Sequence, residues 1–211
     1  TGFYGSYAYH AKLTDKLKLG LGVNAGILQF VMDGHKINLH DPGDYVIQNA
    51  LQSALIPDFS AGFYLYSDKF WIGASALQIA ENKIKFFDYI NTTGVINRHY
   101  YGMAGYRFNI GDDFIIEPSF LAKYVSPSPF QFDAGLRAIY KEKVWLGGSY
   151  RNLDAIAAYV GYIYRENLIF GYSYDFTTSN LRNYSTGTHE LLIGIRFNNQ
   201  GAANGSQSKF Y

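Results

Sequence analysis

Two groups of residues carry side chains that could do chemistry. The first is the segment from Asp33 to Asp44, which holds two histidines and three aspartates. Imidazole and carboxylate groups can coordinate Zn²⁺ or Ca²⁺, but the segment lacks the regular spacing of an EF-hand loop. Its Asp-Gly and Pro-Gly pairs are ordinary turn formers. We therefore favour a loop that binds another protein, with His35, Lys36 and Asp41 among its contacts, over a metal site.

The second group is Ser173, Asp175, His189 and Glu190 near the carboxyl end of the chain. A hydrolase needs a nucleophile, a base and a group that orients the base within hydrogen-bond reach. Alternation along the sequence puts Asp175 and Glu190 on one face of the predicted strands and His189 on the other. The chain also has neither a GxSxG elbow nor an HExxH pair. The sequence therefore predicts no enzyme, no cofactor and no bound metal.

Composition narrows the class of protein. The chain has 211 residues with 18 basic and 17 acidic side chains, a balance that gives no case for a nucleic-acid partner. Cysteine is absent, which excludes disulfides and thiolate metal sites. Charged residues make up 17% of the chain, below the roughly 25% of soluble domains. No stretch approaches the ~20 apolar residues of a transmembrane helix, so the apolar residues must be spread by alternation.

Alternation with a period of two recurs from end to end and predicts strands. The clearest is 168–176, where Leu168, Phe170 and Tyr172 share a face opposite Ile169 and Gly171. We predict eleven antiparallel strands at residues 2–13, 17–31, 58–67, 69–78, 97–110, 114–126, 130–140, 144–151, 155–164, 168–176 and 188–198.

The connections between these strands alternate between two kinds. One set is tight and polar, as in Thr14-Asp15-Lys16 and Lys141-Glu142-Lys143. The other set includes three long loops, predicted at 32–57, 79–96 and 177–187, and two short joints. Alternate joints of an antiparallel meander lie at opposite ends, so one rim carries tight turns and the other carries loops. Outer-membrane β-barrels have this asymmetry.

The two faces of the predicted strands differ in charge. The more apolar face of each strand carries no Asp, Glu, Lys or Arg, as the lipid-facing side of a membrane barrel requires. Tyrosines such as Tyr9, Tyr100 and Tyr140 lie on it, and a membrane interface keeps their hydroxyls wet. We expect the other face to line the lumen with a charge network of Arg107, Glu117, Lys123, Asp133, Arg137, Arg151, Asp175 and Glu190. The alternative is a soluble β-sandwich with an aromatic core.

We therefore predict an all-β, antiparallel transmembrane β-barrel spanning residues 1–198, followed by a flexible tail at 199–211. Bacterial single-chain barrels have an even number of strands and begin and end on the periplasmic side. Eleven strands with Thr1 at the loop rim do not fit that rule. We expect an odd number of strands to precede Thr1 in the whole protein.

Several segments resemble the PorP/SprF family of outer-membrane proteins, which belongs to the type IX secretion and gliding machinery of Bacteroidetes. They are LGLGVNAGILQFVMDGHKINLHDPGD (19–44), PDFSAGFYLYSDKFWIGASALQ (57–78), RHYYGMAGYRFNIGDDFIIEPSFLAKYV (98–125), PFQFDAGLRAIYKEKVWLGGSYR (129–151), DAIAAYVGY (154–162) and GYSYDFTTSNLRNYSTGTHELLIG (171–194). The resemblance covers nearly the whole chain, and the last segment is the most specific.

The resemblance implies a barrel of about fourteen strands in a full-length member. It implies a non-enzymatic role in secreting or anchoring surface adhesins through their C-terminal domains, with links to periplasmic ring and motor proteins. We expect the loop at 177–187, with Arg182, Asn183 and Tyr184, to join the 32–57 loop in a cargo-binding rim, because Arg and Tyr often anchor interfaces. The rival interpretation is a general porin for small solutes.

Overall fold

The computed structural model describes residues 1–33, 51–84, 94–165, 167–184 and 186–197, and these form one large antiparallel sheet and one small hairpin. Side by side, the strands of the large sheet are β1 (Gly2–Lys12), β2 (Lys18–Asp33), β3 (Leu51–Tyr66), β4 (Phe70–Leu77), β7 (His99–Tyr106), β9 (Phe114–Val125), β10 (Gln131–Tyr140), β11 (Val144–Arg151), β12 (Ala155–Tyr164), β13 (Leu168–Thr177) and β14 (Thr188–Ile195). The short strand β8 (Phe108–Ile110) continues β7 beside β9 after a break at Arg107. The all-β, antiparallel prediction is confirmed.

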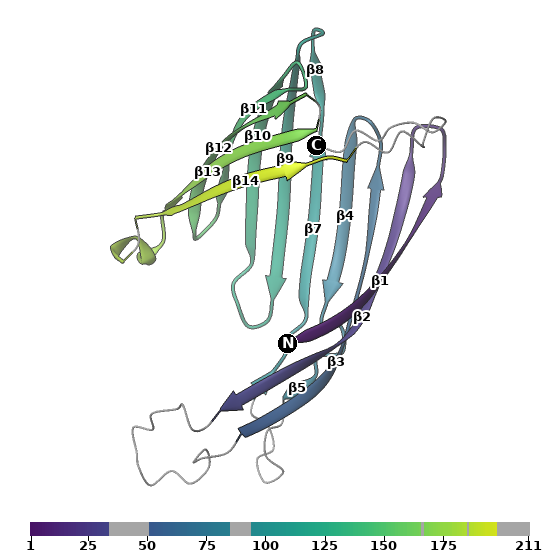
Figure 1. The fold of residues 1–211 in the computed structure, drawn as a ribbon, viewed down its shortest axis with the longest axis vertical. Helices are drawn as coiled ribbons and strands as arrows, with labels where there is room; N and C mark the ends of the chain where they lie inside the picture. The colour runs from purple at the N-terminus through teal and green to yellow at the C-terminus, as the bar shows by residue number, and fades with distance from the viewer. Residues whose placement is uncertain (34–50, 85–93, 166, 185, 198–211) are drawn as a thin grey trace.

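The large sheet curves around a hollow but does not close (Figure 1). The strands of this sheet lie in chain order, with β4 next to β7 because β5 (Lys83–Ile84) and β6 (Gly94–Val95) form the separate hairpin, and the two outermost strands, β1 and β14, have one described partner each. The closed barrel of the sequence-based prediction is therefore not seen in the described residues. None of the described helices is long and apolar enough to cross a membrane.

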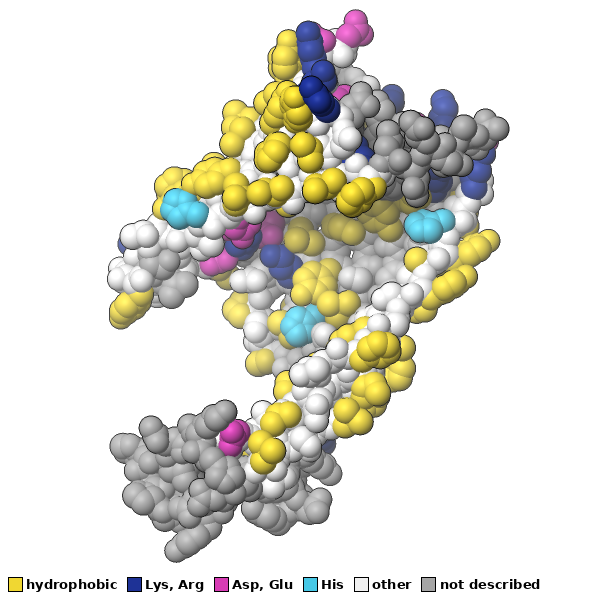
Figure 2. Space-filling view, viewed as in Figure 1, with side chains coloured by type: hydrophobic (Ala, Val, Ile, Leu, Met, Phe, Trp, Pro, Cys, Tyr) yellow, Lys and Arg dark blue, Asp and Glu magenta, His cyan; other side chains and the backbone are white. Residues whose placement is uncertain are grey.

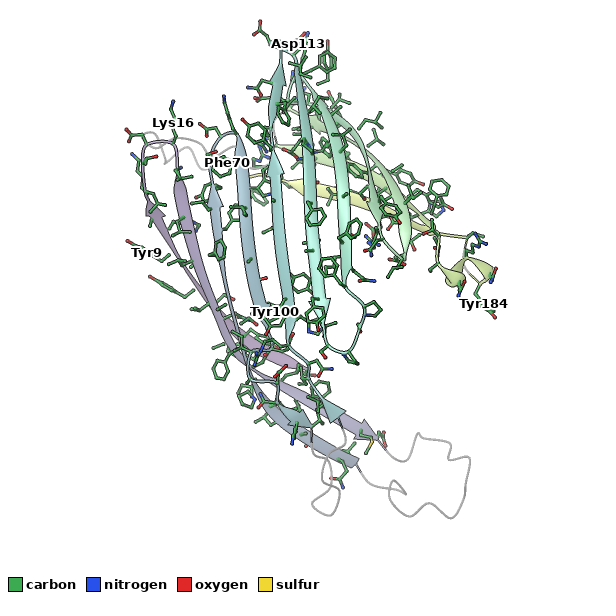
Figure 3. All side chains as sticks on the ribbon, turned by 180° about the vertical axis from the view of Figure 1, so that it is seen from behind. Tyr9, Lys16, Phe70, Tyr100, Asp113 and Tyr184 are labelled. Atoms are coloured by element: carbon green, nitrogen blue, oxygen red, sulfur yellow. The ribbon has the colours of Figure 1, made fainter. Side chains whose placement is uncertain are left out.

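Tight turns gather at one end of the sheet, which we call the tight-turn rim. The Thr14 hydroxyl accepts hydrogen bonds from the backbone N–H groups of Lys16 and Leu17, at 3.3 and 3.1 Å. Lys141 and Glu142 have positive φ angles of 49° and 55°, as in the tight hairpin turns that match strand twist. Lys16 and Asp113 mark this rim in Figure 3. The opposite end is the loop rim.

The predicted loop at 32–57 was wrong in its extent, because residues 51–57 belong to β3. Pro57 lies inside that strand, where proline normally argues against a strand because it cannot donate to the ladder. Here β3 pairs with β2 along its whole length but with β4 only from Ala61 onwards. Pro57 therefore lies in the part of β3 that forms no ladder with β4. The absence of an N–H group is tolerated there. The predicted loop at 79–96 contains the hairpin of β5 (Lys83–Ile84) and β6 (Gly94–Val95).

The sheet has a convex and a concave face that differ in chemistry. Along β3, Leu55 and Phe59 are exposed on the convex face, whereas Ile56, Asp58 and Ser60 are buried on the concave face. Concave side chains converge and therefore bury one another, while convex side chains spread apart. Figure 2 shows acidic and basic side chains inside the hollow and hydrophobic ones along the outer surface. This two-sided pattern positions the charge clusters described below.

Candidate functional site

The concave face carries two groups of paired charges. The first, which we call the Glu117 cluster, consists of Arg107, Glu117 and Arg137 and lies near the tight-turn rim. Arg107 Nε is 2.7 Å from Glu117 Oε2, and Arg137 forms an ion pair with Glu117 Oε1. Glu117 is 4% exposed, so its carboxylate depends on these two guanidinium groups for the interactions that water would otherwise provide. The cluster joins the β7–β8 strand, β9 and β10.

The second group, the Asp133 cluster, lies towards the loop rim and consists of Lys123, Asp133, Arg151, Asp154 and Asp175. Lys123 Nζ is 2.8 Å from Asp133 Oδ2, and Arg151 Nε is 3.3 Å from Asp133 Oδ1. Arg151 Nη1 also lies 3.1 Å from Asp154 and 3.4 Å from Asp175. One guanidinium group therefore bridges carboxylates from β10, β13 and the turn after β11. Asp154 was not among the residues singled out from the sequence.

The hydrolase candidates do not form a triad. Ser173 Oγ donates to Glu190 Oε2 at 3.3 Å, and both side chains lie on the concave face. His189 pairs with Tyr174 in the register of β13 and β14, which puts it on the convex face. There its Nδ1 lies 2.7 Å from the Tyr172 hydroxyl. The described residues contain no group of three or more His, Asp or Glu that could hold a metal ion.

The predicted cargo rim is described only in part. Arg182 and Asn183 lie in the 3₁₀ helix η2 (Asn180–Asn183), and Tyr184 follows it with 91% of its surface exposed. Figure 3 shows Tyr184 at the tip of the β13–β14 arm, away from the tight-turn rim. His35, Lys36 and Asp41 lie outside the described residues.

Aromatic pairs lie near both ends of the convex face. Near the loop rim, Tyr100 and Tyr124 stack with ring centroids 6.4 Å apart. Arg98 Nη1 donates to the Tyr100 hydroxyl at 3.0 Å, and this bond raises the pKa of the guanidinium group above its ordinary value. Near the tight-turn rim, the rings of Phe114 and Tyr140 lie 4.8 Å apart. Such bands are typical of membrane interfaces.

Comparison with known families decides the identity. Residues 1–195 match the family described as type IX secretion system membrane protein PorP/SprF. The chain belongs to the PorP/SprF family. The resemblance in the sequence is thereby confirmed, and this PorP/SprF chain is a membrane protein of the type IX secretion system. No curated protein matches the chain.

A further polar contact of this PorP/SprF chain, between β1 and β3, was not predicted from the sequence. The Tyr4 hydroxyl donates to Asp58 Oδ2 at 3.1 Å, from β1 across β2 to β3. The Tyr4 ring passes over Gly26, where any Cβ would overlap with it. Gly26 lies between Tyr4 and Asp58 on the concave face, and this leaves room for the tyrosine ring to reach the aspartate. The arrangement can be recognised only once the register of the three strands is known.

Proposed function

We propose that this chain is the greater part of a transmembrane β-barrel in the bacterial outer membrane. In this proposal the barrel serves type IX secretion without catalysis, by anchoring or helping to secrete surface adhesins. The observation that supports it most is the two-faced sheet of a PorP/SprF member, with large apolar side chains exposed on the convex face and ion pairs on the concave face. Further strands between the open edges of β1 and β14 would complete the barrel, to the fourteen or so that the family implies.

The membrane arrangement is tested by placing a charge at two leucines of similar exposure. Leu136 lies mid-strand on the convex face of β10 and is 56% exposed, and Leu153 lies in a turn and is 63% exposed. Leu136→Arg should lower the free energy of unfolding in lipid vesicles by about 2–4 kcal/mol, because an arginine would face hydrocarbon. Leu153→Arg should change it by at most about 1 kcal/mol near the interface. Equal, small effects at both sites in a urea titration would contradict a lipid-facing convex surface.

The cargo is proposed to be the C-terminal domain of a surface adhesin, held at the loop rim. Arg182, on the short helix η2, and Tyr184, just after it, are exposed in the connection between β13 and β14. His35, Lys36 and Asp41, outside the described residues, are proposed as further contacts. Ring and motor proteins of the system are proposed to bind on the periplasmic side, where the tight turns would lie.

Replacing Arg182 and Tyr184 together with alanine should reduce surface display of the adhesin at least several-fold, since these residue types often dominate interfaces. The matched control is Leu153→Ala, an exposed residue in a short turn at the same rim that is not among the proposed contacts. Both variants should keep the heat-modifiable electrophoretic mobility of a folded barrel. Immunolabelling of intact cells and mass spectrometry of co-purified proteins give the readouts. Normal surface display of the adhesin by the double variant would refute the proposal that Arg182 and Tyr184 contact the cargo.

A channel for small solutes is the second candidate, favoured by the charged and polar lining of the concave face. It predicts steady single-channel conductance when the full-length protein is placed in planar bilayers. The anchor proposal predicts co-purification of an adhesin C-terminal domain or of periplasmic ring proteins in mild detergent. A bare barrel that conducts ions would favour the channel.

A further inference from the structure

A trough of uncharged side chains crosses the concave face over β1, β2, β3, β4, β7 and β9. It has a volume of about 490 Å³, within the roughly 300–1,000 Å³ of most small-molecule sites. The residues that define it are Ser6, Gly22, Asn24, Ser60, Tyr64 and Met103. We propose that this trough binds a neutral sugar, with hydroxyl and amide groups on one wall and aromatic and apolar groups on the other.

Small residues in register form the floor of the trough. Ala8 on β1 lies opposite Gly22 on β2. Gly22 in turn lies opposite Gly62 on β3, and Gly62 lies opposite Ser75 on β4. A Cβ added at Gly22 would have no atom within 4 Å, so the space above the floor is open there. The main-chain groups of these strands are already used in the ladders of the sheet, and an extended peptide therefore cannot bind over the floor by adding a strand.

The wall on the side of the loop rim is polar. Ser6, Asn24 and Ser60 lie side by side on β1, β2 and β3, in the register row next to the floor on this face. The Ser6 hydroxyl donates to Asn24 Oδ1 at 2.9 Å, and none of the described residues accepts from the Asn24 amide N–H groups.

Ser60 gives the strongest indication of a ligand. It is 8% exposed and lines the trough, and in the part of the chain that the structure describes its hydroxyl has no hydrogen-bond partner. A buried hydroxyl without a partner costs free energy because it has given up its bonds to water. A sugar hydroxyl would restore those bonds, since each hydroxyl can both donate and accept.

The wall on the side of the tight-turn rim is aromatic and apolar. His10, Tyr64 and Met103 belong to one register row that runs across β1, β3 and β7. The Tyr64 ring stacks on Tyr66 with centroids 5.3 Å apart, which holds it in place. The face of an aromatic ring is negative and attracts the weakly positive C–H groups on the face of a sugar ring. A sugar has such a face and an edge of hydroxyls, and it therefore matches both walls.

The lack of formal charge excludes ionic ligands. Among the described residues, no Asp, Glu, Lys or Arg lines the trough. An ion bound there would leave water without gaining a counter-charge. The Glu117 and Asp133 clusters on the same face differ in this respect. A neutral ligand with several hydroxyls is the class that fits, and this inference goes beyond the proposed function because it concerns the hollow and not the loop rim.

The test titrates the full-length protein with maltotriose and cellotriose and follows binding by saturation-transfer difference NMR. The micelles are of lauryldimethylamine oxide, a detergent without a sugar headgroup. At least one of these neutral trisaccharides should bind saturably, and the anionic trigalacturonate should bind at least about fivefold more weakly because the trough offers no counter-charge. No saturable response to either neutral sugar would overturn the inference. Saturable binding of the neutral peptide acetyl-Gly-Ala-Gly-amide in place of the sugars would assign the trough to a peptide.

Two open glycines provide matched variants. Gly102 on β7, like Gly22, has no atom within 4 Å of an added Cβ, but it shares the convex face with Tyr100. Gly22→Leu should fill the trough and abolish sugar binding, and Gly102→Leu should bind as the parent protein does. Equal binding by the two folded variants would contradict a site in the trough.

A smaller change tests the inference if Gly22→Leu does not fold. Ser60→Ala should weaken sugar binding by about fivefold, because it removes a hydrogen-bonding group from the ligand. Ser149→Ala on the concave face of β11, outside the trough, should leave binding unchanged. Surface display of the adhesin should be normal in the Ser60→Ala protein, and the loop-rim double variant should still bind the sugar. Failure of this inference and failure of the proposed function are therefore distinguishable.

Discussion

Replacing Glu117 with glutamine is expected to lower the free energy of unfolding by about 3 kcal/mol. The carboxylate is 4% exposed and joins Arg107 and Arg137, whose side chains are 18% and 22% exposed. Glutamine keeps the shape of the side chain but removes its charge, so two largely desolvated guanidinium groups would lose the counter-ion that they share. Urea titration of the full-length protein in lipid vesicles, followed by tryptophan fluorescence, measures the loss.

The control for this prediction is Asp113→Asn at the tight-turn rim. Asp113 lies 3.8 Å from Lys141, and both side chains are about half exposed, at 51% and 54%. An exposed pair of this kind contributes about 0–1 kcal/mol, so its loss should be close to neutral. If Glu117→Gln proved as mild as Asp113→Asn, the Glu117 cluster would be solvated and would not hold β9 to its neighbours.

Introducing a single methyl group at Gly161 should destabilise the sheet by about 1–3 kcal/mol. The Cβ of Gly161→Ala would overlap with the indole ring of Trp145, its direct cross-strand partner. The ring must therefore leave its position over Gly161. Gly22→Ala is the matched control, since it lies inside β2 and no atom lies within 4 Å of the added Cβ.

A double-mutant cycle separates crowding from a general intolerance of β12 to alanine. With Trp145→Leu in place, the additional cost of Gly161→Ala should fall below about 0.5 kcal/mol, because the overlapping ring is gone. The same penalty in both backgrounds would assign it to the backbone of β12. Thermal or urea unfolding of the four proteins provides the measurement.

Much of the fold could be predicted from alternation, because each strand has one apolar and one mixed face. The sequence-based ranges follow the observed strands closely where a tight turn limits them, as at Tyr140 and Val144. They were wrong where a strand continues past its neighbour. Residues 51–57, which were predicted to be part of a loop, lie in such an extension of β3. Whether the sheet closes depends on contacts between its two edges, which no local pattern encodes.

Charge pairs between adjacent strands could be predicted from the sequence, whereas contacts whose side chains cross a strand could not. Alternation put Lys123 and Asp133 on one face of adjacent strands, within reach of each other, and they lie 2.8 Å apart. The Tyr4–Asp58 hydrogen bond skips over β2 and requires the register of three strands. The position of the Trp145 ring over Gly161 likewise depends on the register of β11 and β12.

The two charge clusters have a consequence for how the hollow acts on ions. The Glu117 cluster holds two guanidinium groups and one carboxylate, whereas the Asp133 cluster holds two cations and three carboxylates. Glu117 and Lys123 are separated along β9 by about 20 Å, well beyond the Debye length of about 8 Å at physiological salt. The interior is therefore electrically polar along its axis, positive near the tight turns and negative near the loops. An ion moving through it would meet opposite fields at entry and exit, so any current should rectify.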